Sequence, residues 1–221
     1  MSIPFHQIHA ILFDLDGTLV DTDDTAAAHL AQRLRPILGD RAWSLSRWLL
    51  MQIETPGNMF ITLLDWLHLD GLVMGLLDML RRRRAAHAPH FQLIPGVEEM
   101  LQTLAPHYKL GLVTTRSRRH IEQFLASVPH LAPLFQVTVG RQDTRRLKPH
   151  PSPVQWAAAR LAVPLPNCLM VGDTTVDVKA ARRAGAWSVG VLCGFGQRKE
   201  LAKAGAHLIL DNTAEIAQIT G

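Results

Sequence analysis

Short apolar runs bounded by turn residues recur along the chain, and segments of helical period separate most of the later runs. Each run has the length and apolar character of a strand buried on both faces, as in a parallel sheet covered by helices. The predicted strands are residues 9–13, 109–113, 168–171, 186–191 and 207–210. The predicted helices are residues 118–127, 153–161, 176–184 and 198–204. This alternation predicts an α/β fold with a doubly wound parallel sheet.

Residues 20–90 interrupt the alternation. They are rich in Leu, Trp, Met and Arg, contain no convincing strand and show helical period in several segments. We therefore expect residues 1–19 and 91–221 to form one α/β core domain and residues 20–90 to form a small all-helical domain inserted after the first strand. The run Arg81–Arg84 would encircle a helix, which favours a solvated basic helix end over a substrate or nucleic-acid contact.

Composition narrows the class of protein. The 221 residues are 48% hydrophobic and 19% charged, with two cysteines, which excludes a disordered tail and a disulfide-stapled mini-protein. The net charge of +4 suits anionic partners without naming them. The chain shows no leader pattern, no membrane-spanning run and no nucleic-acid reader motif, so we expect a cytoplasmic monomer or homodimer that binds neither membrane nor nucleic acid.

Two pairs of carboxylates follow two of the predicted strands. Asp14 and Asp16 come after the first strand, and Asp173 and Asp177 come after the run that ends at residue 171. Because the carboxyl ends of parallel strands meet at one edge of a sheet, these acids can crowd a single site. Crowded carboxylates repel one another and need a cation, and oxygen ligands without thiolate or imidazole favour Mg²⁺.

Further polar residues complement this cluster. Thr114 and Thr115 end the run 110–113, and Lys148 stands in a proline-flanked segment. A hydroxyl with backbone N–H groups, together with an ammonium, is what a phosphoryl group requires from its surroundings. The sequence therefore predicts phosphate chemistry at the same edge of the sheet.

These motifs resemble those of the haloacid dehalogenase superfamily. The run Phe13–Thr22 is similar to the first motif of its phosphatase branch, Thr114 to the second, Lys148 to the third, and Asp173 with Asp177 to the fourth. The resemblance implies a Rossmann-like core, a helical cap after the first motif, and a Mg²⁺-dependent phosphatase that acts on a small phosphorylated metabolite. Residues 189–196 and 204–211 look like the phosphoglycolate phosphatase-like subgroup.

The resemblance also implies a role for each carboxylate. Asp14 would be the nucleophile that forms an aspartyl-phosphate, and Asp16 the general acid and then the general base. The side chains of Asp14 and Asp173 and the backbone carbonyl of Asp16 would hold Mg²⁺. Asp177 would support the metal-bound waters or orient Lys148.

The second motif departs from the family pattern. Thr114 and Lys148 would bind the phosphoryl oxygens, with Thr115 as a further candidate phosphate-binding residue. In much of the branch an Asn follows the Thr, whereas here Thr115 and Arg116 follow it. Arg116 is therefore a possible substrate contact, and an exposed arginine at a helix start is the equal alternative.

Other functions of the same fold use some of the same residues. A phosphomutase, a pyrophosphatase and a non-catalytic binding or regulatory protein remain open. Dehalogenation is disfavoured, because that branch lacks an acid at the position of Asp16 and needs no metal. Phosphonate hydrolysis would require a cap lysine, and none occurs between Val20 and His90.

Overall fold

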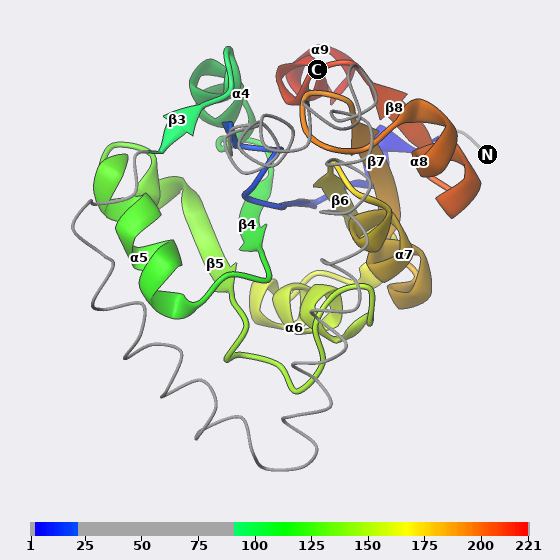
Figure 1. The fold of residues 1–221 in the computed structure, drawn as a ribbon, viewed down its shortest axis with the longest axis horizontal. Coiled ribbons are helices and arrows are strands. Elements are labelled where there is room, and N and C mark those ends of the chain that lie inside the picture. The colour runs from blue at the N-terminus through cyan, green and yellow to red at the C-terminus, as the bar shows by residue number, and fades with distance from the viewer. Residues whose placement is uncertain (1–2, 22–90, 221) are drawn as a thin grey trace, which may run out of the picture.

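A six-stranded parallel sheet forms the centre of residues 3–21 and 91–220, the part of the chain that the computed structural model describes (Figure 1). Its order is β5-β4-β1-β6-β7-β8, and every neighbouring pair is parallel. The strands are β1 (Ala10–Phe13), β4 (Lys109–Val113), β5 (Phe135–Val139), β6 (Cys168–Gly172), β7 (Trp187–Val191) and β8 (Leu208–Leu210). The predicted α/β class and parallel sheet are confirmed.

Helices cover both faces of this sheet. Those that the structure describes are α4 (Val97–Leu104), α5 (Arg118–Ser127), α6 (Ser152–Leu161), α7 (Thr175–Ala184), α8 (Arg198–Ala204) and α9 (Ile216–Thr220). Short 3-10 turns are η1 (Phe5–Gln7), η2 (Ala132–Leu134), η3 (Leu165–Asn167) and η4 (Thr213–Glu215). Helices α4, α5 and α9 pack on one face, and α6, α7 and α8 on the other (Figure 1).

The predicted elements agree closely with the observed ones. Strand β4 and helices α5 and α8 have the predicted bounds, and the other predicted elements differ by one residue at an end. Strand β5 was not predicted, because it is an edge strand whose residues alternate between buried and exposed instead of forming an apolar run. The predicted cap helices and the run Arg81–Arg84 lie outside the described residues.

A two-stranded antiparallel ribbon joins the two described segments that flank residues 22–90. Strand β2 (Val20–Asp21) pairs with β3 (Gln92–Leu93), with Val20 opposite Leu93. The N–H of Ile94 donates to the carbonyl of Leu19 at 3.0 Å and extends the pairing by one step. The two ends of segment 22–90 are therefore adjacent, a few residues beyond the carboxyl end of β1.

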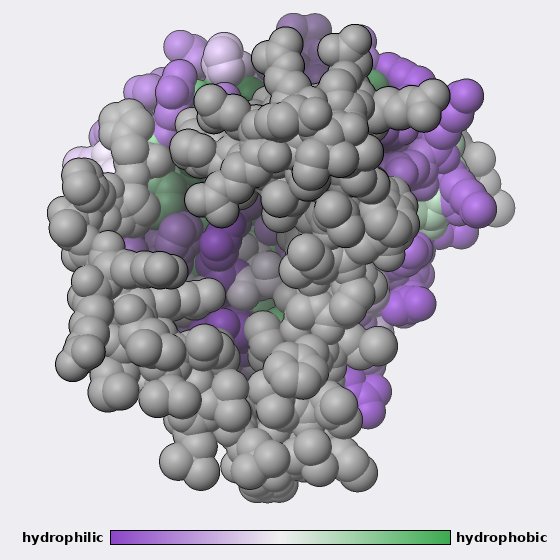
Figure 2. Space-filling model, in the orientation of Figure 1, coloured by the Kyte–Doolittle hydropathy of each residue, from purple (hydrophilic) through white to green (hydrophobic). Residues whose placement is uncertain are grey.

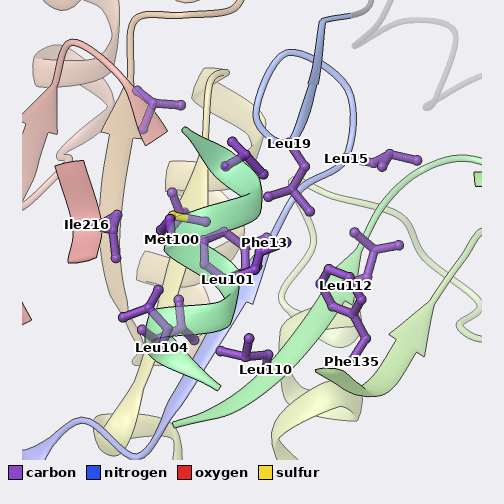
Figure 3. Packing of buried hydrophobic residues seen from close by; sticks show 14 of the residues in the cluster. Phe13, Leu15, Leu19, Met100, Leu101, Leu104, Leu110, Leu112, Phe135 and Ile216 are labelled. Carbon is purple, nitrogen blue, oxygen red and sulfur yellow. The ribbon is translucent and has the colours of Figure 1, made fainter. Parts of the chain in front are cut away.

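Helix α4 packs against the two internal strands β1 and β4. Its apolar residues Val97, Met100, Leu101 and Leu104 recur at the spacing of one helical face, and all four are buried. This face packs in one cluster with residues of β1 and β4, including Phe13 (Figure 3). Each large side chain buried in this way stabilises the fold by about 1.5–3 kcal/mol, which holds the ends of β1 and β4 in place.

The outer surface contrasts with this core. Over α7 and α8 it is mainly hydrophilic (Figure 2), and the exposed residues there include Lys179, Arg182, Lys199 and Lys203. Among residues 3–21 and 91–220, no helix combines the length and the apolar character that crossing a membrane requires.

Candidate active site

The polar residues predicted from sequence gather where the carboxyl ends of three adjacent strands meet. Asp14 follows β1, Thr114 follows β4 and Asp173 follows β6. Strand β1 lies between the other two, with Ile11 paired to Leu110 on one side and to Leu169 on the other. From β1 the strand order continues through β4 and β5 on one side and through β6, β7 and β8 on the other. In α/β sheets, ligands bind beyond the strand ends at such a reversal of the strand order.

Lys148 lies at the centre of this group and is buried. Its ammonium donates to Asp14 Oδ1 at 2.7 Å, to Asp177 Oδ1 at 2.6 Å and to the carbonyl of Val113 at 2.8 Å. These three acceptors match the three protons of an ammonium. Burial alone would lower the pKa of Lys148, but Asp14 and Asp177 outweigh it and raise the pKa, so the side chain is charged.

The ionisation of Asp14 is strongly affected by its surroundings. Burial raises its pKa to about 7; Lys148 opposes this effect, while the negative charges of Asp177 and Asp16 add to it. At neutral pH the Asp14 carboxylate is therefore short of compensating positive charge. A cation beside Asp14 would favour its ionised form.

Asp177 is held at the start of α7 by its own helix. One oxygen, Oδ2, accepts hydrogen bonds from the N–H of Thr174 at 3.1 Å and from the Thr174 hydroxyl at 2.6 Å, in a capping box. The other oxygen accepts from Lys148. Gly172 permits this placement, because a Cβ there would overlap the Asp177 side chain. Both roles expected for Asp177 stay predictions, and its hydrogen bond with Lys148 is the contact that orienting Lys148 would require.

Asp173 is enclosed by backbone. Its Oδ2 accepts from the N–H of Phe195 at 2.8 Å, and the Thr18 hydroxyl approaches its Oδ1 at 3.4 Å. Three glycines line the enclosure, and a Cβ on any of them would collide with Asp173. They are Gly17, Gly194 and Gly196. Gly17 also has φ +70°, a conformation that side chains disfavour.

The donor set fits a hard divalent cation. Asp14, Asp173 and Asp177 are buried, and one carboxylate oxygen from each lies within 4.8 Å of the others. The single positive charge of Lys148 leaves this group with excess negative charge. Carboxylate oxygens in such a setting are the ligands that Mg²⁺ prefers. The part played by the Asp16 backbone carbonyl stays a prediction.

The remaining predicted residues line the side of β4. Thr114 is buried, and its Oγ1 accepts the N–H of Arg116 at 3.2 Å, while Thr115 is half-buried beside it. Asp16 is not part of the buried carboxylate group. Instead, it forms an ion pair with Arg116, with Nε to Oδ2 at 2.7 Å and Nη2 to Oδ1 at 3.2 Å.

Sequence reasoning missed the residues that enclose Asp173. The run 194–196 contributes to the sequence analysis only as part of a subgroup resemblance, although two glycines in the loop after a strand are a signal of close backbone approach. Thr18 and the carbonyl of Val113 were also missed. A backbone acceptor carries no residue-type signal, so no sequence pattern could have identified Val113.

The sequence model of the haloacid dehalogenase-like hydrolase family matches residues 11–191 of this chain. The chain belongs to this family. The resemblance drawn from the four motifs is thereby confirmed, and the chain is an enzyme, a haloacid dehalogenase-like phosphatase.

Relatives narrow the comparison. The chain is 32% identical over 192 residues to a phosphoglycolate phosphatase of Xanthomonas campestris pv. campestris (strain 8004), with 84% of each chain covered. It is 30% identical over 219 residues to pyrophosphatase PpaX of Anoxybacillus flavithermus, with 97% of each covered. A crystal structure of a predicted phosphoglycolate phosphatase from Haemophilus somnus 129pt superposes with a TM-score of 0.65 at 26% identity, covering 97% of this chain and 99% of the other.

Proposed function

We propose that this chain is a Mg²⁺-dependent phosphatase that hydrolyses small phosphate monoesters through an aspartyl-phosphate on Asp14, as a phosphoglycolate phosphatase-like enzyme. The observation that carries the proposal is the position of Asp14, buried at the end of β1 against Lys148 and beside two further carboxylates. This arrangement supports a nucleophile that is held in one orientation and surrounded by groups able to balance charge.

In the first half of the reaction, an oxygen of Asp14 attacks phosphorus and the bond from phosphorus to the ester oxygen breaks. Asp16 gives a proton to the departing oxygen, so the product leaves as an alcohol. The Thr114 hydroxyl binds a phosphoryl oxygen, and Lys148, fixed by Asp177, does so in exchange for one of the three hydrogen bonds that its ammonium donates in this structure. Mg²⁺ held by Asp14 and Asp173, with the carbonyl of Asp16, would neutralise charge on the transferring phosphoryl group.

In the second half, Asp16 takes a proton from a water molecule, and that water attacks phosphorus. The bond between phosphorus and Asp14 breaks, which releases inorganic phosphate and restores the Asp14 carboxylate. Asp16 thus gives a proton in one step and takes one back in the next, so the enzyme returns to its starting state.

A pyrophosphatase is the second candidate, and one comparison favours it. The relative named pyrophosphatase PpaX is 30% identical with 97% of each chain covered, which is as similar as the phosphoglycolate phosphatases at 32% over 84% and 29% over 97% of this chain. The two functions share the nucleophile and differ in the group that leaves from phosphorus. Substrate turnover therefore separates them directly.

The test is phosphate release from phosphoglycolate, sugar phosphates, nucleoside monophosphates and pyrophosphate, each with Mg²⁺ and with a chelator. We expect Mg²⁺-dependent turnover of at least one of these by the wild type and background rates for Asp14→Asn. Preferential turnover of pyrophosphate would favour the second candidate. A thermal melt of Asp14→Asn shows whether the variant remains folded.

Asp211→Asn is the matched control, because the Asp211 side chain is 77% exposed and pairs only at the surface with Arg198. It should retain the wild-type rate. Hydrolysis by Asp14→Asn at the wild-type rate would refute the assignment of the nucleophile.

A further inference from the structure

Asp16 and Arg116 join two strand ends at the edge of the carboxylate group. The guanidinium presents two nitrogens to the two oxygens of one carboxylate, a bidentate geometry. The Arg116 side chain is 48% exposed and that of Asp16 is 18% exposed. An ion pair this open to solvent adds little to folding stability, so another anion can displace it.

The backbone of Arg116 is fixed even though its side chain reaches into solvent. Its N–H donates to the Thr114 hydroxyl, and its carbonyl accepts the N–H of Arg141 at 2.9 Å. Gly140 packs so closely that a Cβ there would approach the same carbonyl at 3.0 Å. A displacement of the guanidinium would therefore be a rotation of the side chain about a fixed backbone beside Thr114.

The contact has a consequence for catalysis. Both oxygens of Asp16 accept hydrogen bonds from Arg116, so this bidentate ion pair holds the carboxylate toward Arg116 and away from a leaving group on Asp14. Asp16 becomes available when the guanidinium takes another partner. The planar fork of an arginine matches a carboxylate or a phosphate.

The surroundings favour an anionic partner. The two segments 116–119 and 140–146, which follow β4 and β5 (Figure 1), contain six arginines and a single acid, Asp143. Asp143 is already paired with Arg118, with Nη2 to Oδ1 at 2.7 Å. Besides Arg116, the arginines are Arg118, Arg119, Arg141, Arg145 and Arg146. Their combined field raises the local concentration of anions.

We propose that Arg116 binds a second anionic group of the substrate, a carboxylate or a further phosphate, and thereby releases Asp16 to act as the general acid. The inference rests on the proposed function and adds a substrate class to it: phosphoesters with a second negative group close to the phosphorus. Monoesters of neutral alcohols leave the Arg116–Asp16 pair in place and are poorer substrates.

The test compares three substrates that differ in the second group. Phosphoglycolate carries a carboxylate, pyrophosphate carries a second phosphoryl group, and 2-hydroxyethyl phosphate matches phosphoglycolate in size but is neutral there. Wild-type enzyme should prefer at least one anionic substrate. Arg116→Ala should lower kcat/KM for that substrate by about tenfold or more, the effect of one charge-assisted hydrogen bond, mainly through a higher KM.

For 2-hydroxyethyl phosphate, Arg116→Ala should keep or raise kcat, because the variant frees Asp16. Arg116→Lys retains the charge but not the fork, so it should restore part of the preference. Arg198→Ala is the control, since Arg198 forms a comparable exposed pair with Asp211 elsewhere on the surface. Equal losses on all three substrates would show that Arg116 only maintains the site and would overturn the inference, as would an unchanged preference.

Hydrolysis of p-nitrophenyl phosphate keeps this inference separate from the proposed function. If wild-type turnover of that ester is lost in Asp14→Asn while Arg116→Ala leaves the substrate preference unchanged, the role of Arg116 alone is refuted. If no phosphoester shows turnover that depends on Asp14, the proposed function is refuted as well.

Discussion

Replacing Lys148 with Met should destabilise the protein strongly, although Met fills nearly the same space. The substitution removes the donor to Asp14, Asp177 and the carbonyl of Val113, all within 2.8 Å, from a side chain that is 2% exposed. Breaking a buried ion pair from one side leaves an uncompensated charge and costs about 3–5 kcal/mol. For a chain of this length that corresponds to a decrease in Tm of roughly 10 °C.

The pH dependence of this loss has a definite sign. Lys148 opposes the upward shift of the Asp14 pKa, so the pKa of Asp14 rises above about 7 in Lys148→Met. The folded variant then binds a proton that the folded wild type releases near neutrality. The loss of stability is therefore greatest at alkaline pH and decreases as the pH is lowered through 7.

Urea denaturation in the presence of a chelator, at pH 6 and pH 8.5, measures the free energy of unfolding of both proteins. The double variant Lys148→Met/Asp14→Asn should recover part of the loss, because the neutral amide removes the buried charge. The electrostatic account is refuted if Lys148→Met unfolds within 0.5 kcal/mol of the wild type, roughly the scatter of surface substitutions, or if the double variant is no more stable than the single one.

Two further predictions concern Asp173 and the cysteines. A Cβ at Gly196 would overlap the backbone carbonyl of Asp173, whereas Gly185 has open space around it and only a positive φ of 81°. In a thermal titration, Gly196→Ala should therefore weaken the stabilisation of the protein by Mg²⁺, and the control Gly185→Ala should leave it intact. Equal Mg²⁺ responses in both variants would contradict this. Burial raises the pKa of Cys168 to about 11, so at pH 8 only about 0.1% of this residue is thiolate. In the variant Cys193→Ser, where Cys168 is the remaining cysteine, iodoacetamide should label Cys168 only after unfolding. Rapid labelling of the folded variant would show that Cys168 is accessible.

The elements predicted correctly share a strong local signal. Strand β4 is a continuous apolar run, and α5 begins after Ser117, whose hydroxyl caps the helix. Strand β5 lacks that signal, because its pairing with β4 stabilises a segment that alternates in polarity. Helix α4 was also not predicted, although its buried apolar residues have the helical period of a single face, so a local signal was present there and was missed.

The site divides in the same way. That Asp14 and Asp173 lie close together follows from the parallel sheet alone, since β1 and β6 end side by side. The partners of each side chain do not follow. Whether Arg116 points to solvent or to Asp16 depends on a distance between two loops, and a sequence position carries no information about that distance.

The ribbon of β2 and β3 has a consequence for how this enzyme can change over time. Because Asp21 and Gln92 are paired neighbours in β2 and β3, a turn of a few residues could join them without moving any strand of the main sheet. The same pairing tolerates an intervening segment of very different length, since the entropy of closing a loop grows only slowly with its size. Insertions and deletions within residues 22–90 over evolution therefore need not disturb the pairing of β2 with β3.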